Sequence, residues 1–149
     1  MVVRAVVTRV KHASVSIEGT VRGQIGEGYL VLLGVAPGDS EETALKLADK
    51  ICNLRVFEDE NGKMNLSLEQ VGGSLLVISQ FTLFADTSSR RPGFTGAAKP
   101  DLAVPLYEKF MGRCRERGVV VEHGEFGAEM EVDSLNHGPV TILFDTEKS

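Results

Sequence analysis

The chain has 149 residues, of which 42% are hydrophobic and 25% charged, and its formal net charge at pH 7 is −5. A chain of this length buries roughly 68–70% of its unfolded surface, so we expect residues 1–149 to form one domain without disulfides or metal. The negative charge argues against a protein that coats nucleic acid through bulk electrostatics, because phosphate binding requires clustered Lys and Arg. No apolar run approaches the roughly 20 residues of a membrane span, and the short apolar N-terminus is unlike a signal peptide, which predicts a cytoplasmic protein with no membrane partner.

The first third of the chain is strand-like. Residues 2–10 are rich in β-branched side chains, and residues 13–17 alternate between apolar and polar. A turn at 18–20 leads into a returning strand at 21–25. Residues 29–35 are almost continuously apolar, which is typical of a strand buried on both faces.

Two helices interrupt the strands. The first begins at Ser40, where acids in the first turn favour the positive end of the helix dipole, and its apolar spacing continues to Ile51. The second runs from about Asp101 to Arg117 and stops before Gly118. The remaining segments are a turn at 59–63, a Ser, Arg, Gly and Pro-rich loop at 87–100, and strands at 75–78, 119–122, 128–135 and 140–144. This order predicts an α/β domain, a mixed sheet with two helices packed on one side.

The cysteines and histidines do not indicate a redox or metal site. Cys52 and Cys114 lie far apart without CxxC spacing, so we interpret them as reduced, half-buried hydrophobes, with a disulfide or reactive thiol as the minority alternative. The histidines, His12, His123 and His137, are dispersed. We therefore expect neither zinc nor any other cofactor.

Two groups of basic residues are candidates for contact with RNA. Arg90 and Arg91 are adjacent, and Lys109, Arg113 and Arg117 recur every four residues on one face of the second helix. Either group is explained equally well as solvated surface, and for the helical stripe we favour that interpretation.

Polar residues directly follow the buried strand at 75–78. They are Ser79, Gln80, Phe81 and Thr82, at a strand end where functional groups are often held. A hydroxyl nucleophile needs a neighbouring base, and the sequence offers no His, Lys or acid before Asp86. Pairing of the two hydroxyls with backbone is the simpler interpretation. Alternatively, Gln80 and the N–H groups of Phe81 and Thr82 line an oxyanion site.

A second polar segment, residues 136–141, interrupts the strands near the C-terminus. Within it Pro139 removes a donor from the sheet, and Gly138 before it leaves the backbone open to close approach. An X–Pro bond is also cis at little cost. On composition alone this segment is a hairpin turn between strands 128–135 and 140–144.

Taken together, segments 79–82 and 136–141 resemble those of a known family, the bacterial-type D-aminoacyl-tRNA deacylases, also called D-tyrosyl-tRNA(Tyr) deacylases. The resemblance covers nearly the whole chain, in order and almost without gaps. The other matching stretches are Thr8 to Val10, 13–15, Gly34-Val35, 57–59, 62–65, Gly72-Gly73, Leu83, 85–87 and Arg91-Pro92.

The resemblance implies a fold, a reaction and a set of site residues. The fold is a three-layer β/β/α homodimer with active sites at the subunit interface. The substrate is charged tRNA, whose terminal adenosine assists ester hydrolysis through its 2′-hydroxyl. Ser79, Gln80, Phe81 and Thr82 match the catalytic wall. Gly138 and Pro139 match a Gly-cisPro motif that enters the partner's pocket and excludes L-residues, and Asn136 and Met64 complete the substrate-binding set.

Three residues depart from the family pattern. The family commonly has Asp at His137, Gln at Thr8 and Ser at Gly93, and the loop at 88–90 is one residue shorter. These departures affect substrate preference and loop contacts rather than the reaction.

Two other functions stay open on the sequence. One is a dimeric RNA-binding module without turnover, although the chain has few exposed aromatic clusters of the kind that stack bases. The other is hydrolysis of mischarged glycyl-tRNA, which is compatible with the first activity.

Overall fold

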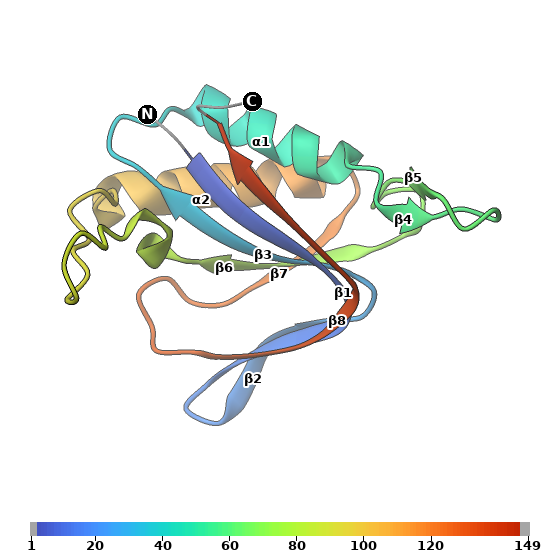
Figure 1. Ribbon diagram of the computed structural model, residues 1–149, viewed down its shortest axis with the longest axis horizontal. Helices are drawn as coiled ribbons and strands as arrows, with labels where there is room; N and C mark the ends of the chain where they lie inside the picture. Colours follow the sequence, from blue (N-terminus) through green and yellow to red (C-terminus); the bar gives the residue numbers. More distant parts are fainter. Residues whose placement is uncertain (1–2, 147–149) are drawn as a thin grey trace.

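A long first strand connects the parts of the main sheet (Figure 1). The computed structural model describes residues 3–146, and β1 (Val3–Ile17) is one continuous strand where the sequence predicts two. Its first half pairs antiparallel with β3 (Gly28–Val35) and its second half with β2 (Thr20–Ile25). β8 (Glu131–Asp145) runs antiparallel to both halves. The predicted first strand starts at Val2, which lies outside the described residues.

Two parallel strands complete the main sheet. β6 (Ser74–Ser79) pairs parallel with β3, and β7 (Val120–His123) pairs parallel with β6. Parallel neighbours require long crossover connections, and these contain α1 (Glu41–Asn53) and α2 (Pro100–Glu116). Both helices cover the same face of the sheet in Figure 1. The predicted mixed sheet with two helices on one side is therefore confirmed.

The other face of the main sheet is covered by strands. β2 and the adjoining halves of β1 and β8 curl beneath the sheet in Figure 1. Val10 and Val15 of β1 pack in one buried cluster with Leu30 of β3 and with Leu76 and Ile78 of β6. This second core gives the β/β/α layering that the resemblance implies.

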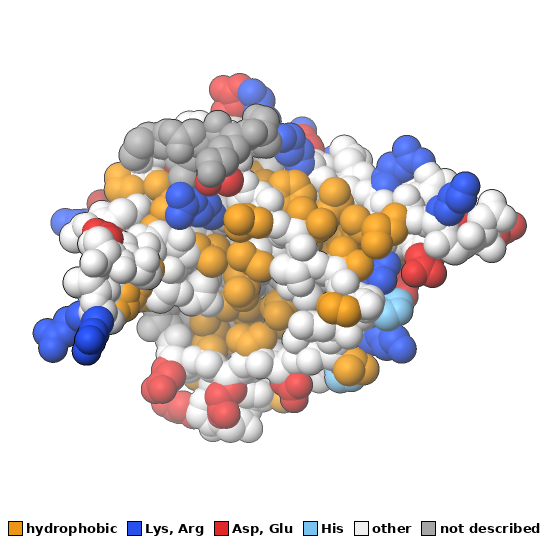
Figure 2. Space-filling model, in the orientation of Figure 1, with side chains coloured by type: hydrophobic (Ala, Val, Ile, Leu, Met, Phe, Trp, Pro, Cys, Tyr) orange, Lys and Arg blue, Asp and Glu red, His pale blue; other side chains and the backbone are white. Residues whose placement is uncertain are grey.

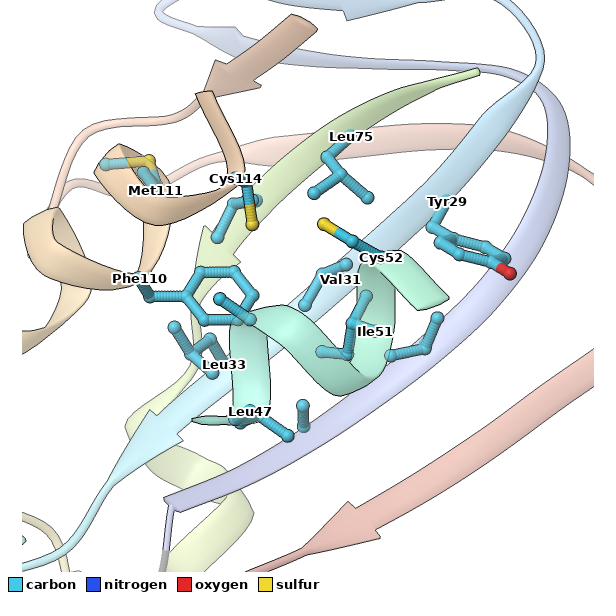
Figure 3. Packing of buried hydrophobic residues seen from close by; sticks show 14 of the residues in the cluster. Tyr29, Val31, Leu33, Leu47, Ile51, Cys52, Leu75, Phe110, Met111 and Cys114 are labelled. Carbon is cyan, nitrogen blue, oxygen red and sulfur yellow. The ribbon is translucent and has the colours of Figure 1, made fainter. Parts of the chain in front are cut away.

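The helices bury a larger core against the sheet (Figure 3). Phe110 of α2 and Ile51 of α1 are fully buried, and each side chain of this kind contributes about 1.5–3 kcal/mol on burial. Cys52 and Cys114 are also fully buried and both thiols are free. The hydrogen bond with Cys52, together with burial, raises the pKa of the Cys114 thiol, which keeps it protonated and unreactive. The prediction of two reduced hydrophobes is confirmed, although they are more deeply buried than expected and lie against each other.

The helix ends follow the sequence signals. The Ser40 hydroxyl accepts a hydrogen bond from the N–H of Thr43 at 3.3 Å and caps α1. Gly118 follows α2 with φ +85°, and its N–H donates to the carbonyl of Arg115 at 2.9 Å. None of the described helices is long and apolar enough to span a membrane.

The basic stripe of α2 is occupied by acidic partners. Arg113 and Arg117 both bind Asp49 of α1, at 3.0 and 3.1 Å, and Lys109 lies 3.6 Å from Glu41. These ion pairs hold the two helices together and agree with the interpretation of the stripe as ordinary protein surface.

The small sheet forms a hairpin at one end of the molecule. β4 (Phe57–Glu58) pairs with β5 (Met64–Leu66) across the predicted turn, in which the N–H of Asp59 donates to Lys63 at 2.9 Å. In Figure 1 this hairpin projects at the right, opposite the end of the molecule where β6 leads into a short 3-10 helix, η1 (Phe81–Phe84).

Candidate active site

The first wall of the site is built where β6 ends. Ser79 is its last residue and aligns with Leu33 of β3, whose carbonyl accepts the N–H of Gln80 at 2.8 Å. The chain then turns into η1, which the sequence does not predict. Ser79 and Gln80 are half-buried, whereas Phe81 and Thr82 are exposed. The pairing of β6 with β3 therefore fixes the start of the wall and presents its end to solvent.

In the described part of the chain, the hydroxyls of this wall have no neighbouring base. Gln80 donates a side-chain hydrogen bond to the Thr82 hydroxyl oxygen. Within residues 3–146, no His, Lys or carboxylate side chain is hydrogen-bonded to Ser79 or Thr82, and the backbone N–H groups of Phe81 and Thr82 have no acceptor. The wall can therefore offer hydrogen-bond donors to a developing oxyanion, but it lacks the activated nucleophile of a serine hydrolase.

A pocket of about 270 Å³ opens beside this wall. Ile78 and residues 79–81 of the wall form one side. The segment before β8 and the start of β8 form the other side, which sequence reasoning missed. The lining residues on that second side are Phe126, Gly127, Ala128, Met130 and Val132. The volume is close to the lower end of small-ligand sites, roughly 300–1,000 Å³, and matches a small group such as an amino acid better than a whole nucleotide.

The Gly138-Pro139 segment does not form a hairpin turn. The proposed strands on its two sides are one strand, β8, and both halves pair with β1. Asn136 aligns with Val10 and Thr141 with Thr8, so four residues of β8 lie opposite the single residue Arg9. The surplus forms a bulge, residues 137–140, and a bulge accommodates a proline that cannot donate to the ladder. The Gly138–Pro139 peptide bond is cis, as the resemblance predicts.

Arg9 holds this bulge from beneath. Its side chain is only 3% exposed, its Nε donates to the carbonyl of His137 at 3.1 Å, and its Nη1 donates to the carbonyl of Val56 at 2.6 Å. A Cβ at Gly138 would lie 2.8 Å from Arg9 Nη2. Sequence reasoning passed over Arg9, although a charged residue inside an apolar strand pattern is the signal that marks it.

The predicted site residues lie at separate places in one chain. Asn136, exposed and bonded to the Ser134 hydroxyl at 2.8 Å, lies next to the bulge. Met64, 56% exposed, lies on the β4–β5 hairpin, opposite the end of the molecule that carries η1 (Figure 1). The wall at 79–82 lies elsewhere.

The separation of wall and bulge follows from the strand register. Three strand spacings of about 4.8 Å separate β8 from β6, roughly 14 Å. Arg9 is also four residues from Ala5, which aligns with Leu33 and thereby with Ser79, so the offset along the strands is roughly 13 Å. One chain therefore does not bring the bulge to the wall.

The three departures from the family pattern lie outside the wall. The Thr8 hydroxyl is 3.5 Å from that of Thr141, and His137 Nδ1 is buried without a partner among residues 3–146. A Cβ at Gly93 would meet only Asp86 Cβ, at 4.0 Å, so a serine would fit there. None of these residues belongs to the wall.

Comparison with known proteins tests the resemblance over nearly the whole chain. The family model described as D-Tyr-tRNA(Tyr) deacylase matches residues 6–145. The chain belongs to the D-Tyr-tRNA(Tyr) deacylase family. It is 55% identical to a D-aminoacyl-tRNA deacylase of Symbiobacterium thermophilum, with 100% of this chain and 99% of the relative covered, and 53% identical to one of Thermosipho africanus, with 97% and 98% covered. The chain is thus an enzyme of the hydrolase class.

Two solved structures share the fold of this chain. A structure described as c-Myc DNA Unwinding Element Binding Protein superposes with a TM-score of 0.89 at 39% identity, covering 95% of this chain and 97% of its own. A probable eukaryotic D-amino acid tRNA deacylase has a TM-score of 0.83 at 19% identity, covering 97% and 100%. At that identity the second likeness shows the shared fold.

Proposed function

We propose that the chain hydrolyses the ester between a D-amino acid and the terminal adenosine of tRNA, releasing the free D-amino acid and the tRNA in the cytoplasm. Each active site combines the wall at 79–82 of one copy with the bulge at 137–140 of a second copy. The observation that carries this proposal is the separation of wall and bulge within one chain, since both match the family's site segments. A two-fold dimer, in which each copy offers the same surface, brings each bulge to the other copy's wall.

The surface of β8 supports an assembly of this kind. Val132, Leu135 and Leu143 are 41%, 48% and 68% exposed. Figure 2 shows hydrophobic side chains gathered in the middle of one face of the molecule. Contiguous exposed apolar surface on a soluble protein commonly marks an interface. A second copy that covers β8 would also contact the bulge, which is part of this strand.

The chemistry we propose relies on donors and on the substrate's own RNA. Water attacks the ester carbonyl, the carbonyl oxygen becomes an oxyanion, and collapse expels the 3′-oxygen of the adenosine, which takes up a proton. The unpaired N–H groups of Phe81 and Thr82 stabilise the oxyanion. Because none of the described residues places a base beside Thr82, we assign the positioning of water to the neighbouring 2′-hydroxyl of the adenosine.

Selection among substrates follows from the bulge. A proofreading enzyme for D-residues accepts many side chains, so it reads only the arrangement of groups about Cα. Main-chain carbonyls of Gly138 and Pro139 bind the substrate amine in our proposal, and an L-residue held in the same way directs its side chain into that backbone. Arg9 limits movement of the bulge, because its guanidinium is buried and donates hydrogen bonds to two backbone carbonyls. Glycine has no side chain to exclude, so glycyl-tRNA is a further substrate.

Mixing two inactive variants tests the shared site. Gln80→Ala impairs the wall and Gly138→Val impairs the bulge, so each variant alone loses hydrolysis of D-tyrosyl-tRNA. After the two are unfolded together and refolded, half of random dimers are mixed and each contains one intact site, which restores about a quarter of wild-type activity. No recovery in mixtures that contain mixed dimers would contradict the shared site. A fully active monomer near 16 kDa in sedimentation would contradict the dimer itself.

Nucleic-acid binding without turnover is the alternative, and the description of the 39% identical structure as a DNA-binding protein is the observation in its favour. The family match and the curated relatives favour the enzyme. Release of free D-tyrosine from D-tyrosyl-tRNA separates the two, because a binding module releases none.

A further inference from the structure

A basic excursion of the chain begins directly after the wall. Residues 87–92 project between Asp86 and Gly93, whose backbones exchange hydrogen bonds of 2.7 and 2.9 Å. Beyond this bridge Phe94 returns to contact Phe81 edge to face, with ring centroids 5.1 Å apart. The base of the excursion is therefore fixed to the wall, while its tip extends into solvent.

Arg90 and Arg91 occupy the tip of this excursion, and both are exposed. Figure 2 shows Lys and Arg side chains clustered at the end of the segment that is coloured olive in Figure 1. Neither guanidinium has an ion pair or hydrogen bond within residues 3–146. The acid of this segment, Asp86, accepts the N–H of Ser88 at 2.9 Å, which lowers the pKa of its carboxyl. Its carboxylate is thus used by the loop backbone rather than by either arginine.

Other arginines of the chain are engaged. Arg113 and Arg117 bind Asp49, Arg22 lies 3.8 Å from Glu125, and Arg115 donates to a backbone carbonyl at 3.1 Å. The sequence offers two basic groups for contact with RNA. In the structure the stripe on α2 is neutralised by acidic partners, whereas Arg90 and Arg91 are not.

The substrate of the proposed function is a polyanion that carries its ester at one end. A chain with a net charge of −5 repels such a substrate at long range, so productive binding needs local cations close to the pocket. Arg90 is three residues from Gly93, so its Cα lies at most roughly 10–11 Å from the Asp86–Gly93 bridge. Its long side chain extends the reach further, beyond a pocket that accommodates only the aminoacyl end. Arginine binds phosphate through two parallel N–H···O bonds.

We propose that Arg90 and Arg91 bind phosphates of the tRNA acceptor end next to the terminal adenosine and thereby direct the 3′ end into the pocket. This inference rests on the proposed function for the identity of the RNA. The exposed ring of Phe94, at the base of the excursion, offers a stacking surface for an adjoining base.

Binding of uncharged tRNA measured at several salt concentrations tests this surface. The double variant Arg90→Gln/Arg91→Gln is compared with Lys46→Gln/Lys50→Gln, which removes the same charge from exposed positions of α1. Losing two phosphate contacts lowers the magnitude of the salt slope by about 1.4–1.8 and weakens binding roughly tenfold, whereas the lysine variant stays within about twofold. An unchanged slope, or an equal loss in the lysine variant, overturns the proposal.

Hydrolysis of two substrates then separates this surface from the proposed function. The arginine variant loses kcat/KM on D-tyrosyl-tRNA roughly in proportion to its binding, but it retains the wild-type rate on D-tyrosyl-adenosine, which has no further phosphates. Equal losses on both substrates would show a structural effect and overturn the proposal. Failure of the wild type to release D-tyrosine would refute the proposed function alone. The binding measurement tests the arginine surface separately, because it does not depend on hydrolysis.

Discussion

Replacing Gly138 by alanine adds one methyl group at the most constrained point of the bulge. The φ angle of Gly138 is +119°, in a region that L side chains rarely adopt. The new Cβ would lie 2.8 Å from Arg9 Nη2, 2.9 Å from Val140 Cγ2 and 3.1 Å from the backbone nitrogen of Val140. Arg9 is held by hydrogen bonds to two carbonyls, and the Val140 nitrogen belongs to the main chain. Neither neighbour can therefore move away from the new Cβ at low energetic cost.

The cost of Gly138→Ala has two parts. The unfavourable backbone angle costs about 1–3 kcal/mol, and overpacking against Arg9 and Val140 costs about 1–3 kcal/mol more. We therefore expect the free energy of unfolding to fall by about 2–6 kcal/mol. A displacement of the bulge that relieves part of this strain moves its carbonyls, and a shift near 1 Å costs about 100-fold in rate.

A matched glycine isolates the role of the bulge. Gly62 has φ +73° in the β4–β5 turn, and a Cβ there would meet no heavy atom within 4 Å. Gly62→Ala thus carries the backbone cost alone, and it should lose some stability to urea while keeping wild-type hydrolysis of D-tyrosyl-tRNA. If the two alanine variants matched each other in both unfolding and kcat/KM, the constraint we assign to Gly138 would be refuted.

Three further predictions follow from the wall, the helix pair and the core. Thr82→Ala retains hydrolysis within about tenfold of wild type, since losing a true nucleophile costs several orders of magnitude; a covalent aminoacyl-Thr82 in mass spectra would contradict this. Asp49→Asn lowers the free energy of unfolding near pH 7 by about 1 kcal/mol, because hydrogen bonds from Arg113 and Arg117 lower the pKa of Asp49 below its ordinary 3.8. This contribution is present above pH 3.8 and disappears as the pH falls through the folded-state pKa, so a difference in urea midpoint that persists unchanged at pH 2 would refute the assignment. Phe110→Ala, at a fully buried position, lowers the free energy of unfolding by about 3–5 kcal/mol with kcat unaltered, and a loss below about 1 kcal/mol in urea titration would contradict the core we describe.

Local signals were sufficient for most of the fold. The Ser40 cap, the apolar spacing of α1 and the stop at Gly118 are interactions within a few residues, so they can be read along the chain. Continuity of strands is different, because it depends on pairing partners. β8 is one strand only because β1 runs beside both of its halves, and the proline inside it is absorbed by a bulge. When the pairing with β1 is unknown, residues 136–141 are equally consistent with a hairpin turn.

The segments proposed for the site stand out in the sequence, whereas their arrangement in space does not. Ser79 to Thr82 and Gly138-Pro139 stand out because polar residues and proline break an apolar strand pattern. Arg9 was missed because its partners are two carbonyls distant in sequence, His137 and Val56. Which basic residues remain free was also beyond the sequence, since the ion pairs of Arg113 and Arg117 depend on the packing of α1 against α2.

Parallel hydrolysis of D-tyrosyl-tRNA and L-tyrosyl-tRNA by the purified protein tests the central claim most directly. The two substrates differ only in configuration at Cα, so charge, RNA contacts and side-chain size cancel in the comparison. Our account predicts efficient release of D-tyrosine and almost no release of L-tyrosine. Comparable rates on the two substrates would contradict it.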